Sequence, residues 1–242
     1  MNFLFNAIIF GFLLNFILIS LFHNVPIMTK AGWINAGILG TVLWICLSWQ
    51  GWLSVVIYLL LGSLVTKLGY KYKVERGIAE KRGGRRGPEN VWGSAATGLF
   101  FALMIKLNIA NSSLLGVAFA ASFAAKLADT FGSEIGKRFG KTTFFITSFK
   151  KVKKGTEGAI SIEGTLASLI GSFLMSYVML LLGLIAFQSE FLIVFVSGFI
   201  ATIFESIIGE KYQAKFRLSN EAINSIQTSL SSTIAILIFN LT

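Results

Sequence analysis

The chain has 242 residues, of which 55% are hydrophobic, and its mean hydropathy is +0.75. It carries 21 Lys and Arg against 11 Asp and Glu, a formal net charge of +10 at pH 7. This composition excludes a water-soluble globular protein, because several apolar runs approach the ~20 residues that a helix needs to cross a bilayer. The runs do not alternate with polar residues, so a transmembrane β-barrel is excluded too. The single cysteine and single histidine exclude a disulfide framework and a Cys/His zinc site within the chain.

Eight apolar stretches are predicted to be transmembrane helices: residues 3–22, 33–48, 52–68, 91–106, 113–128, 161–187, 191–208 and 222–241. The first lacks a basic N-terminal region and a small-residue cleavage site, so we interpret it as a retained helix and not as a signal peptide. A tight turn is expected at residues 49–51, between the second and third helices. We therefore predict an all-α protein, a polytopic transmembrane bundle of about eight helices that forms one integral membrane domain, residues 1–242.

The basic residues are concentrated in three loops. Seven Lys or Arg lie within residues 70–90, seven within 137–154 and three within 211–217. With eight helices these loops share one side of the membrane with Lys30, and the positive-inside rule assigns that side to the cytoplasm. Both termini then lie on the opposite side. Topology and attraction to anionic lipids account for the number of charges but not for their arrangement.

One helical stripe combines groups of both charges. If the helix that begins near residue 113 continues beyond the membrane, Ser122, Lys126, Asp129 and Ser133 share one face at i, i+4, i+7 and i+11. Ionisable groups beside an apolar run are costly to desolvate, so we interpret Lys126 and Asp129 as part of a site, with each other as structural partners. The alternative is an i,i+3 salt bridge at a helix end with no further role.

Glycines and carboxylates are interleaved with the basic residues. One loop reads Lys81-Arg82-Gly83-Gly84-Arg85-Arg86-Gly87, and another places Gly132, Gly136 and Gly140 beside Lys137, Arg138 and Lys141. Glycine lets the backbone approach an anion and expose its N–H groups, so this combination suits phosphate. The same regions contain Glu80, Glu89, Asp129, Glu134 and Glu157. Carboxylates near phosphate favour Mg²⁺, which binds through one or two carboxylates plus phosphate oxygens.

Three later helices also carry polar stripes. The residues are Ser161, Thr165, Ser168 and Ser172; Thr202, Glu205, Ser206 and Gly209; and Asn220, Asn224, Gln227, Thr228 and Ser231. A Ser/Thr seam is typical of helix packing in lipid, and this interpretation suits the first stripe. Glu205 differs, because a carboxylate inside an apolar run needs a cation, a metal or water. We therefore expect a site role for Glu205.

Known phosphate motifs do not fit the chain. The segment from Gly136 to Thr142 is similar to a P-loop, but it has three residues between its glycines where that motif needs four, and it follows a membrane helix. The sequence also lacks G-x-G-x-x-G, H-E-x-x-H, a nucleophile elbow and the signature of CDP-alcohol phosphotransferases. A P-loop ATPase is therefore excluded.

Five sequence blocks, taken in order, resemble a known membrane family. They are RGIAEKRGGRRGPENVWGSAATG, LADTFGSEIGKRFGK, KKGTEGAISIEGTLAS, FESIIG and LSNEAINSIQT. They resemble the family that contains the plant and cyanobacterial phytyl-phosphate kinases of tocopherol synthesis, and the resemblance covers the chain from Gly32 onward. The blocks around Asp129 and Glu157 are the most specific, and they are distantly similar to the CTP-dependent dolichol and phytol kinases. The chain departs from the family pattern at Glu205 and Glu221, where Asp is common.

The resemblance implies transfer of a phosphoryl group from a nucleoside triphosphate (CTP, UTP or ATP) to phytyl phosphate, which gives phytyl diphosphate. It implies a multi-pass protein of a bacterial or cyanobacterial inner or thylakoid membrane, with its site on the cytoplasmic side. The partners would be a prenyl phosphate lipid and a nucleotide, with no nucleic acid. Two nearer alternatives, a prenyl-alcohol kinase and a lipid cytidylyltransferase, stay open. A transporter of anionic lipids would be expected to show paired broken helices in two related halves, and the sequence has no such repeat.

Roles follow for the candidate residues. Asp129, Glu134 and Glu157 are predicted to bind Mg²⁺ and, with Lys137, to form the catalytic group. Lys137, Lys141 and Lys154 are assigned to the donor phosphates, and Lys81, Arg82, Arg85 and Arg86 to phosphate of either substrate. Asn90, Asn220 and Asn224 are candidates for hydrogen bonds to phosphate or base, and Lys126 and Ser133 for substrate contacts. Glu205 is expected to hold a second metal or to orient a lysine.

Overall fold

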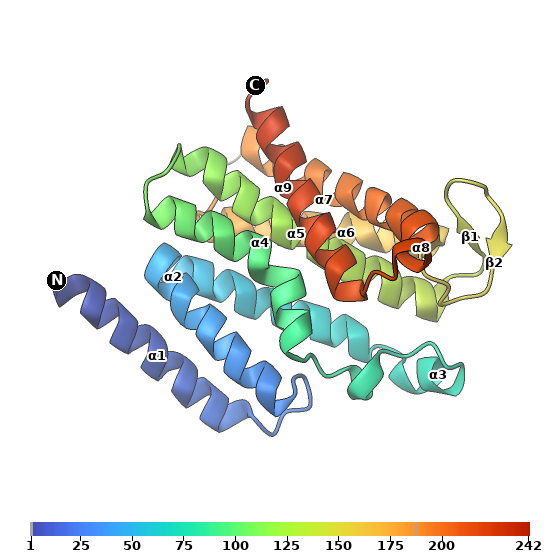
Figure 1. The fold of residues 1–242 in the computed structure, drawn as a ribbon, viewed down its shortest axis with the longest axis horizontal. Helices are drawn as coiled ribbons and strands as arrows, with labels where there is room; N and C mark the ends of the chain where they lie inside the picture. Colours follow the sequence, from blue (N-terminus) through green and yellow to red (C-terminus); the bar gives the residue numbers. More distant parts are fainter. Residues whose placement is uncertain (1, 187) are drawn as a thin grey trace.

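The structure is a computed structural model that describes residues 2–186 and 188–242. Figure 1 shows a bundle of long helices with a small sheet at one end. The long helices are α1 (Asn2–Phe22), α2 (Lys30–Lys67), α4 (Pro88–Lys106), α5 (Ser112–Phe139), α6 (Ile162–Leu181), α7 (Ser189–Ile208) and α9 (Asn220–Phe239). Shorter pieces are α3 (Tyr70–Glu75), the 3-10 turn η1 (Lys81–Gly84), the π-helical η2 (Gly209–Gln213) and α8 (Ala214–Phe216). The predicted all-α membrane bundle is confirmed.

The long α2 is two helices that meet at a reversal. Ser48 has φ 56 and ψ −155, which is not helical, and Figure 1 shows the chain folding back there. The two arms correspond to the predicted helices at residues 33–48 and 52–68, with the reversal one residue before the predicted turn. The reversal brings Gly51 against Leu47, where a Cβ on Gly51 would overlap Leu47 Cβ and lie 3.0 Å from Leu47 Cδ1. Glycine is therefore the residue that fits this turn.

Six helices in the described part of the chain are long and apolar enough to cross a membrane: Leu4–Phe22, Lys30–Lys67, Ser112–Phe139, Ile162–Leu181, Ser189–Phe216 and Asn220–Phe239. The second of these contains two predicted helices, and α4 corresponds to the predicted helix at residues 91–106. The prediction for residues 161–187 was too long. Helix α6 ends at Leu181, and Gly183 follows with a left-handed φ of 68°, a conformation that ends helices. Phe187 lies outside the described residues.

Helix α5 is the centre of the bundle. It runs unbroken from Ser112 to Phe139, so the predicted extension of this helix beyond its apolar part is confirmed. Its small residues let neighbouring backbones approach closely. On α6, a Cβ at Gly164 would lie 2.8 Å from the carbonyl oxygen of Gly132, and one at Gly171 would lie 2.8 Å from that of Leu127. Contact between α5 and α6 therefore depends on glycine.

A three-stranded sheet follows α5. Strands β1 (Thr143–Phe145), β2 (Lys151–Val152) and β3 (Ala159–Ile160) are antiparallel and have the order β2-β1-β3, with Thr143 opposite Val152 and Phe145 opposite Ala159. From the sequence we expect only a basic loop here. Strands of two or three residues are too short to show a period-2 pattern, and these lie among lysines. The sheet holds the Gly155–Gly158 turn beside the end of α7, where a Cβ on Gly158 would lie 2.6 Å from the carbonyl oxygen of Ser206.

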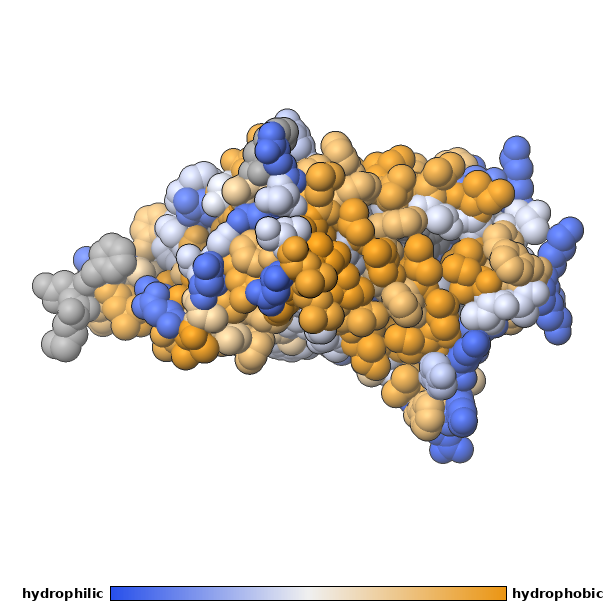
Figure 2. Space-filling model, turned by 90° about the horizontal axis from the view of Figure 1, so that it is seen from above, coloured by the Kyte–Doolittle hydropathy of each residue, from blue (hydrophilic) through white to orange (hydrophobic). Residues whose placement is uncertain are grey.

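Polar groups gather at one end of the bundle. Figure 1 places α3, α8 and the sheet together at the right, away from both chain termini. Figure 2 shows hydrophilic residues at that end and a broad hydrophobic surface along the helices. The turn before α2 joins the same end, because the Thr29 N–H donates to the Arg86 carbonyl at 3.0 Å. The start of α2, with Lys30, thus lies beside the first basic loop, as the topology prediction requires.

This arrangement predicts opposite locations for two reporters. A reporter inserted near Gly84 should be cytoplasmic, because the basic loops lie at that end, and one fused after Thr242 should lie on the other side of the membrane. Activity measurements with a pair of reporters, one active only inside and one only outside the cytoplasm, check this. If both positions report the same side, the predicted number of membrane crossings is wrong.

Candidate functional site

A cavity of about 640 Å³ lies at the polar end of the bundle. Its wall is built from the loop before α4, the end of α5, the turn after β2, the start of α6, the end of α7 and the start of α9. Of the predicted site residues, those that line it are Lys81, Arg82, Arg85, Arg86, Asn90, Lys126, Asp129, Ser133, Glu134, Lys137, Glu157, Glu205, Asn220 and Asn224. The fold therefore brings together side chains from positions throughout the last two thirds of the sequence.

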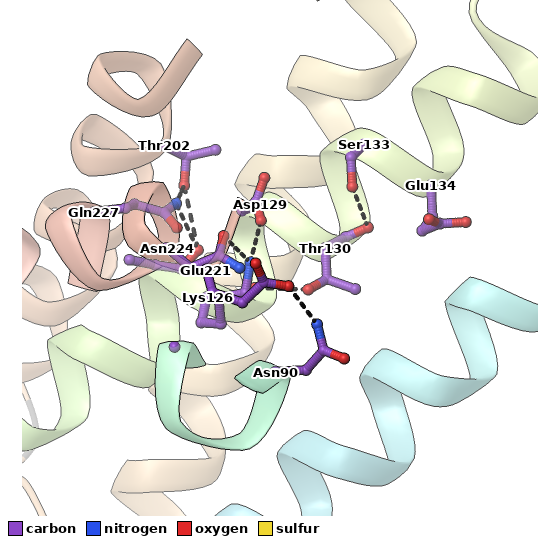
Figure 3. A network of polar contacts seen from close by, with 12 residues as sticks. Asn90, Lys126, Asp129, Thr130, Ser133, Glu134, Thr202, Glu221, Asn224 and Gln227 are labelled. Carbon is purple, nitrogen blue, oxygen red and sulfur yellow. Dashed lines mark hydrogen bonds and ion pairs between the residues drawn. The ribbon is translucent and has the colours of Figure 1, made fainter. Parts of the chain in front are cut away.

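The ion pair of Lys126 and Asp129 lies on the α5 wall of this cavity. Lys126 is buried and pairs with Asp129, and its Nζ also donates to Asn224 Oδ1 of α9 at 2.7 Å (Figure 3). The expected partnership of Lys126 with Asp129 is present. Ser122, which was expected on the same stripe, lies deeper and donates to the Phe119 carbonyl at 2.7 Å. The cavity therefore begins at the level of Lys126, and Ser122 belongs to the core.

Asn90 joins the first basic loop to α9. Its Oδ1 accepts from the Gly87 N–H at 2.9 Å, which caps α4, and from Arg82 Nη2 at 2.6 Å. Its Nδ2 donates to Glu221 Oε1 at 3.1 Å (Figure 3). Arg82 also pairs with Glu89. One amide side chain thus fixes the arginine loop against a helix more than a hundred residues further along the chain.

Arg86 extends from this loop into the bundle. Its Nη1 donates to Tyr58 Oη at 3.1 Å, and its guanidinium lies 5.5 Å from the centre of the Tyr58 ring. A Cβ at Gly62 would lie 2.6 Å from Nη2 of Arg86, so Gly62 leaves space for the guanidinium. Arg86 also lines the cavity. Its guanidinium is therefore held on the wall of the cavity that adjoins the apolar interior of the bundle.

A second buried ion pair was not predicted. Lys73 of α3 is fully buried, and its Nζ donates to the Thr66 carbonyl at 2.8 Å and pairs with Glu134 of α5. Glu134 Oε1 lies 3.7 Å from Lys137 Nζ, which in turn lies 2.7 Å from Glu80 Oε1. Nothing in the sequence separates Lys73 from the other lysines of its loop. The sequence does indicate that a carboxylate such as Glu134 needs a nearby cation. It does not identify that cation, because Lys73 is 61 residues away in the chain.

These contacts give the Glu134 carboxylate, predicted as a metal ligand, a partner within the protein. The Glu134 carboxylate is buried and committed to Lys73, so we interpret it as the support of Lys137 at the cavity wall. Within residues 2–186 and 188–242, no three His, Cys, Asp or Glu side chains are grouped so as to hold a metal ion. The predicted set of Asp129, Glu134 and Glu157 is therefore not assembled in this structure. Asp129, Glu157 and Glu205 still line the same cavity.

Two exposed carboxyl groups at the cavity mouth, those of Glu80 and Glu157, have pKa values shifted in opposite directions. Partial desolvation acts to raise the pKa of Glu80, but the Lys137 ammonium outweighs it, so this pKa lies below its ordinary value. Partial desolvation raises the pKa of Glu157, which the more distant Lys137 only partly opposes. Glu80 is thus held as the anion that pairs with Lys137. Glu157 lacks such close compensation, and a cation beside it would favour its charged form.

Two predicted phosphate ligands lie elsewhere. Neither Lys141 nor Lys154 is among the described residues that line the cavity. The Lys141 N–H donates to Glu163 Oε1 at 3.2 Å, and Lys154 Nζ lies 5.9 Å from the centre of the Tyr72 ring. After Gly140 the chain enters strand β1, and both lysines lie in the segment of the sheet, outside the cavity wall. The sequence assigns them to phosphate because glycines and basic residues are interleaved there, a pattern that does not reveal the strands.

The polar stripes of α6 and α9 divide by depth. Ser161, Thr165 and Ser168 line the cavity, whereas Ser172 donates to the Phe195 carbonyl at 2.7 Å. On α9, Asn220 and Asn224 line the cavity. Deeper residues bind α5, because Gln227 Nε2 donates to the Ala125 carbonyl at 3.1 Å and Ser231 Oγ to that of Ala121 at 2.8 Å. Each stripe therefore serves packing inside the bundle and contributes to the site only at its end.

The Lys73–Glu134 pair predicts a double-mutant cycle. Lys73→Met should destabilise the protein by about 3 kcal/mol or more, because it leaves Glu134 buried without its closest cation. Lys73→Met/Glu134→Met should recover part of this loss, measured as thermal unfolding in detergent. Lys71→Met on the exposed face of the same helix is the matched control and should change little. Equal unfolding temperatures for Lys73→Met and the wild type would show that the pair is not needed.

Comparison with known proteins places the chain among membrane proteins of plants and microorganisms. It matches the family described as Integral membrane protein DUF92 over residues 13–234. It is 44% identical over 230 residues to an uncharacterized membrane protein of Synechocystis sp., covering 93% of this chain and 88% of that protein. It is 42% identical over 216 residues to Protein VTE6, chloroplastic, of Arabidopsis thaliana, covering 87% of this chain and 65% of that protein. An uncharacterized membrane protein of Methanocaldococcus jannaschii is 28% identical over 214 residues, 88% of this chain and 86% of that protein. No solved structure matches the chain.

Proposed function

The chain belongs to the integral membrane protein family DUF92, and we propose that it is a prenyl-phosphate kinase that converts phytyl phosphate to phytyl diphosphate. The similarity to plant and cyanobacterial members confirms the family resemblance seen in the sequence blocks. The match to Protein VTE6, chloroplastic, supports a role in tocopherol or prenylquinone synthesis. From the similarity to a cyanobacterial protein we propose that the protein lies in a bacterial or cyanobacterial inner or thylakoid membrane. From the positive-inside rule we propose that its site is on the cytoplasmic side.

The observation that carries the proposal is the composition of the cavity. Cationic groups and carboxylates line one space at the polar end of a bundle whose outer surface is apolar. A prenyl chain can lie along apolar helices while its phosphate reaches this space, and a nucleotide can enter from water. Lysine and arginine supply the charge that two phosphate-bearing substrates require.

The reaction needs little proton transfer. An oxygen of the prenyl monophosphate, already anionic, attacks the terminal phosphorus of the nucleotide, and the bond from that phosphorus to the bridging oxygen breaks. The products are the prenyl diphosphate and a nucleoside diphosphate. Catalysis is then mainly alignment and neutralisation of charge. Lys126 and Lys137 are rigid cations for this purpose, because Asp129 and Asn224 fix the first and Glu80 and Glu134 fix the second.

The oxygen donors of the cavity suit Mg²⁺ that arrives with the nucleotide, since this ion needs only one or two protein carboxylates. Asp129 would hold it, with Glu157 and Glu205 as further candidates, and Glu134 is committed to Lys73. The bound ion would supply neutralisation of charge on the phosphate oxygens. The residues proposed to bind phosphate of either substrate, as predicted from the sequence, are Lys81, Arg82, Arg85 and Arg86.

The direct experiment supplies purified protein with phytyl phosphate or phytol, each with CTP, UTP or ATP carrying a labelled terminal phosphate, and Mg²⁺. The proposal expects the label in phytyl diphosphate, formed from phytyl phosphate. Label transferred to phytol alone would identify a prenyl-alcohol kinase. Release of pyrophosphate with a nucleotide-linked lipid would identify a cytidylyltransferase. No transfer with any pair would contradict a kinase and favour a transporter.

Asp129→Asn separates a reaction role from a structural one. If Asp129 offsets the charge of a metal ion, Asn should lower turnover by ~10²-fold or more, as for loss of one preorganised electrostatic contact. The folded, inserted protein should be retained, because Asn224 still binds Lys126. Turnover and the amount of folded, inserted protein are both measured. The control in both measurements is Glu75→Gln, a substitution at an exposed residue outside the cavity. If Lys126→Met/Asp129→Asn recovers stability and turnover together, Asp129 is only the counterion of Lys126.

A further inference from the structure

A second cavity adjoins the first. It measures about 610 Å³, and its lining includes Phe145, Thr156, Glu157, Glu210, Gln213 and Arg217. Thr156, Glu157 and Gln213 line both cavities, so the two spaces meet at these residues. Figure 1 shows the elements of its wall, β1 and α8, beside each other at the polar end. A volume of this size is within the range of small-ligand pockets.

The lining of the second cavity differs from that of the first. It carries one aromatic ring, Phe145, one amide, Gln213, one guanidinium, Arg217, and the carboxylates of Glu157 and Glu210. A flat aromatic ring suits stacking with a planar heterocycle. An amide and a carboxylate accept from N–H and O–H groups, and the amide and the guanidinium also donate. This set fits a nucleobase with its sugar better than it fits another phosphate.

The backbone around this cavity is specialised. Helix α7 continues into the π-helical segment η2, Gly209–Gln213, a feature that is frequent at functional sites. Gln213 Nε2 donates to Asn220 Oδ1 at 2.6 Å, and Asn220 lines the first cavity. Glu210 Oε1 accepts from Thr147 Oγ1 at 2.5 Å, which ties η2 to the turn after β1. The two cavities are therefore joined by fixed contacts as well as by shared residues.

We propose that the second cavity is the nucleoside subsite of the donor nucleotide. The base stacks on Phe145, Gln213 and Glu210 contact the edge of the base or the ribose hydroxyls, and the phosphates pass Thr156 and Glu157 into the cationic cavity. This assignment rests on the proposed function, because it needs a nucleoside triphosphate as donor. It accounts for the use of one sheet, one π-helical turn and one glycine turn to build a space that the prenyl phosphate does not need.

The test compares a nucleotide with a probe that has phosphates only. Dissociation constants are measured for the nucleoside triphosphate that supports turnover and for inorganic tripolyphosphate, which lacks base and sugar. Phe145→Ala should weaken nucleotide binding roughly 5- to 50-fold, the range for loss of one stacked ring, and leave tripolyphosphate binding unchanged. Phe145→Leu keeps apolar volume in β1 and should act in the same direction if Phe145→Ala does not fold. The matched control is Phe144→Ala, since Phe144 is next in the strand but stacks on Phe149 at 6.1 Å, outside the second cavity.

The outcomes separate this inference from the proposed function. Selective loss of nucleotide binding in the Phe145 variants supports the nucleoside subsite. Equal loss for nucleotide and tripolyphosphate, or no loss for either, overturns it while the kinase proposal stands. A wild-type protein that binds neither probe overturns the proposed function and this inference together.

Discussion

The need to pair buried charge determines how the polar end of this bundle is built. Lys73, Lys126 and Glu134 are almost fully removed from solvent, and each would be very costly without a partner. Their partners come from other turns and other helices, so pairing fixes α3 and α9 on α5. Glycine contacts fix α6 on α5 as well, because they let the two backbones approach closely. Charge pairing and glycine packing thus meet on one helix.

This construction has a direct consequence for chemistry. A cation that already has its counterions in place does not have to reorganise when an anionic substrate arrives, which is the condition for electrostatic catalysis. Lys126 and Lys137 satisfy it, since each is held by two side chains at the cavity wall. Arg82 and Arg85 of the first basic loop are more exposed to solvent, so they suit capture and orientation of phosphate. The cavity therefore combines lysines that are largely shielded from solvent with arginines that solvent reaches.

Much of this could be predicted from the sequence, because the controlling signals are local. The length of the apolar runs predicted the helices, and helical spacing placed Lys126, Asp129 and Ser133 on one face. The failures involve contacts over long separations. Lys73 is indistinguishable from its neighbours until the fold brings Glu134 to it. Lys141 and Lys154 lie outside the cavity wall, in the segment of a sheet whose strands are too short to detect by periodicity. The π-helical turn and the second cavity have no pattern in the sequence at all.

The central claim is that substrate phosphates occupy the cavity at the end of α5, and chemical protection of Ser133 tests it directly. Ser133 is exposed and lines the cavity, so Ser133→Cys in a Cys46→Ser background should react with a water-soluble maleimide. Phytyl phosphate and nucleotide should slow this reaction increasingly as their concentrations rise, until the cavity is saturated. Labelling of Ser148→Cys at the exposed tip after β1 should not change. If Ser133→Cys reacts at the same rate while the protein turns over substrate, the phosphates bind elsewhere and the account is wrong.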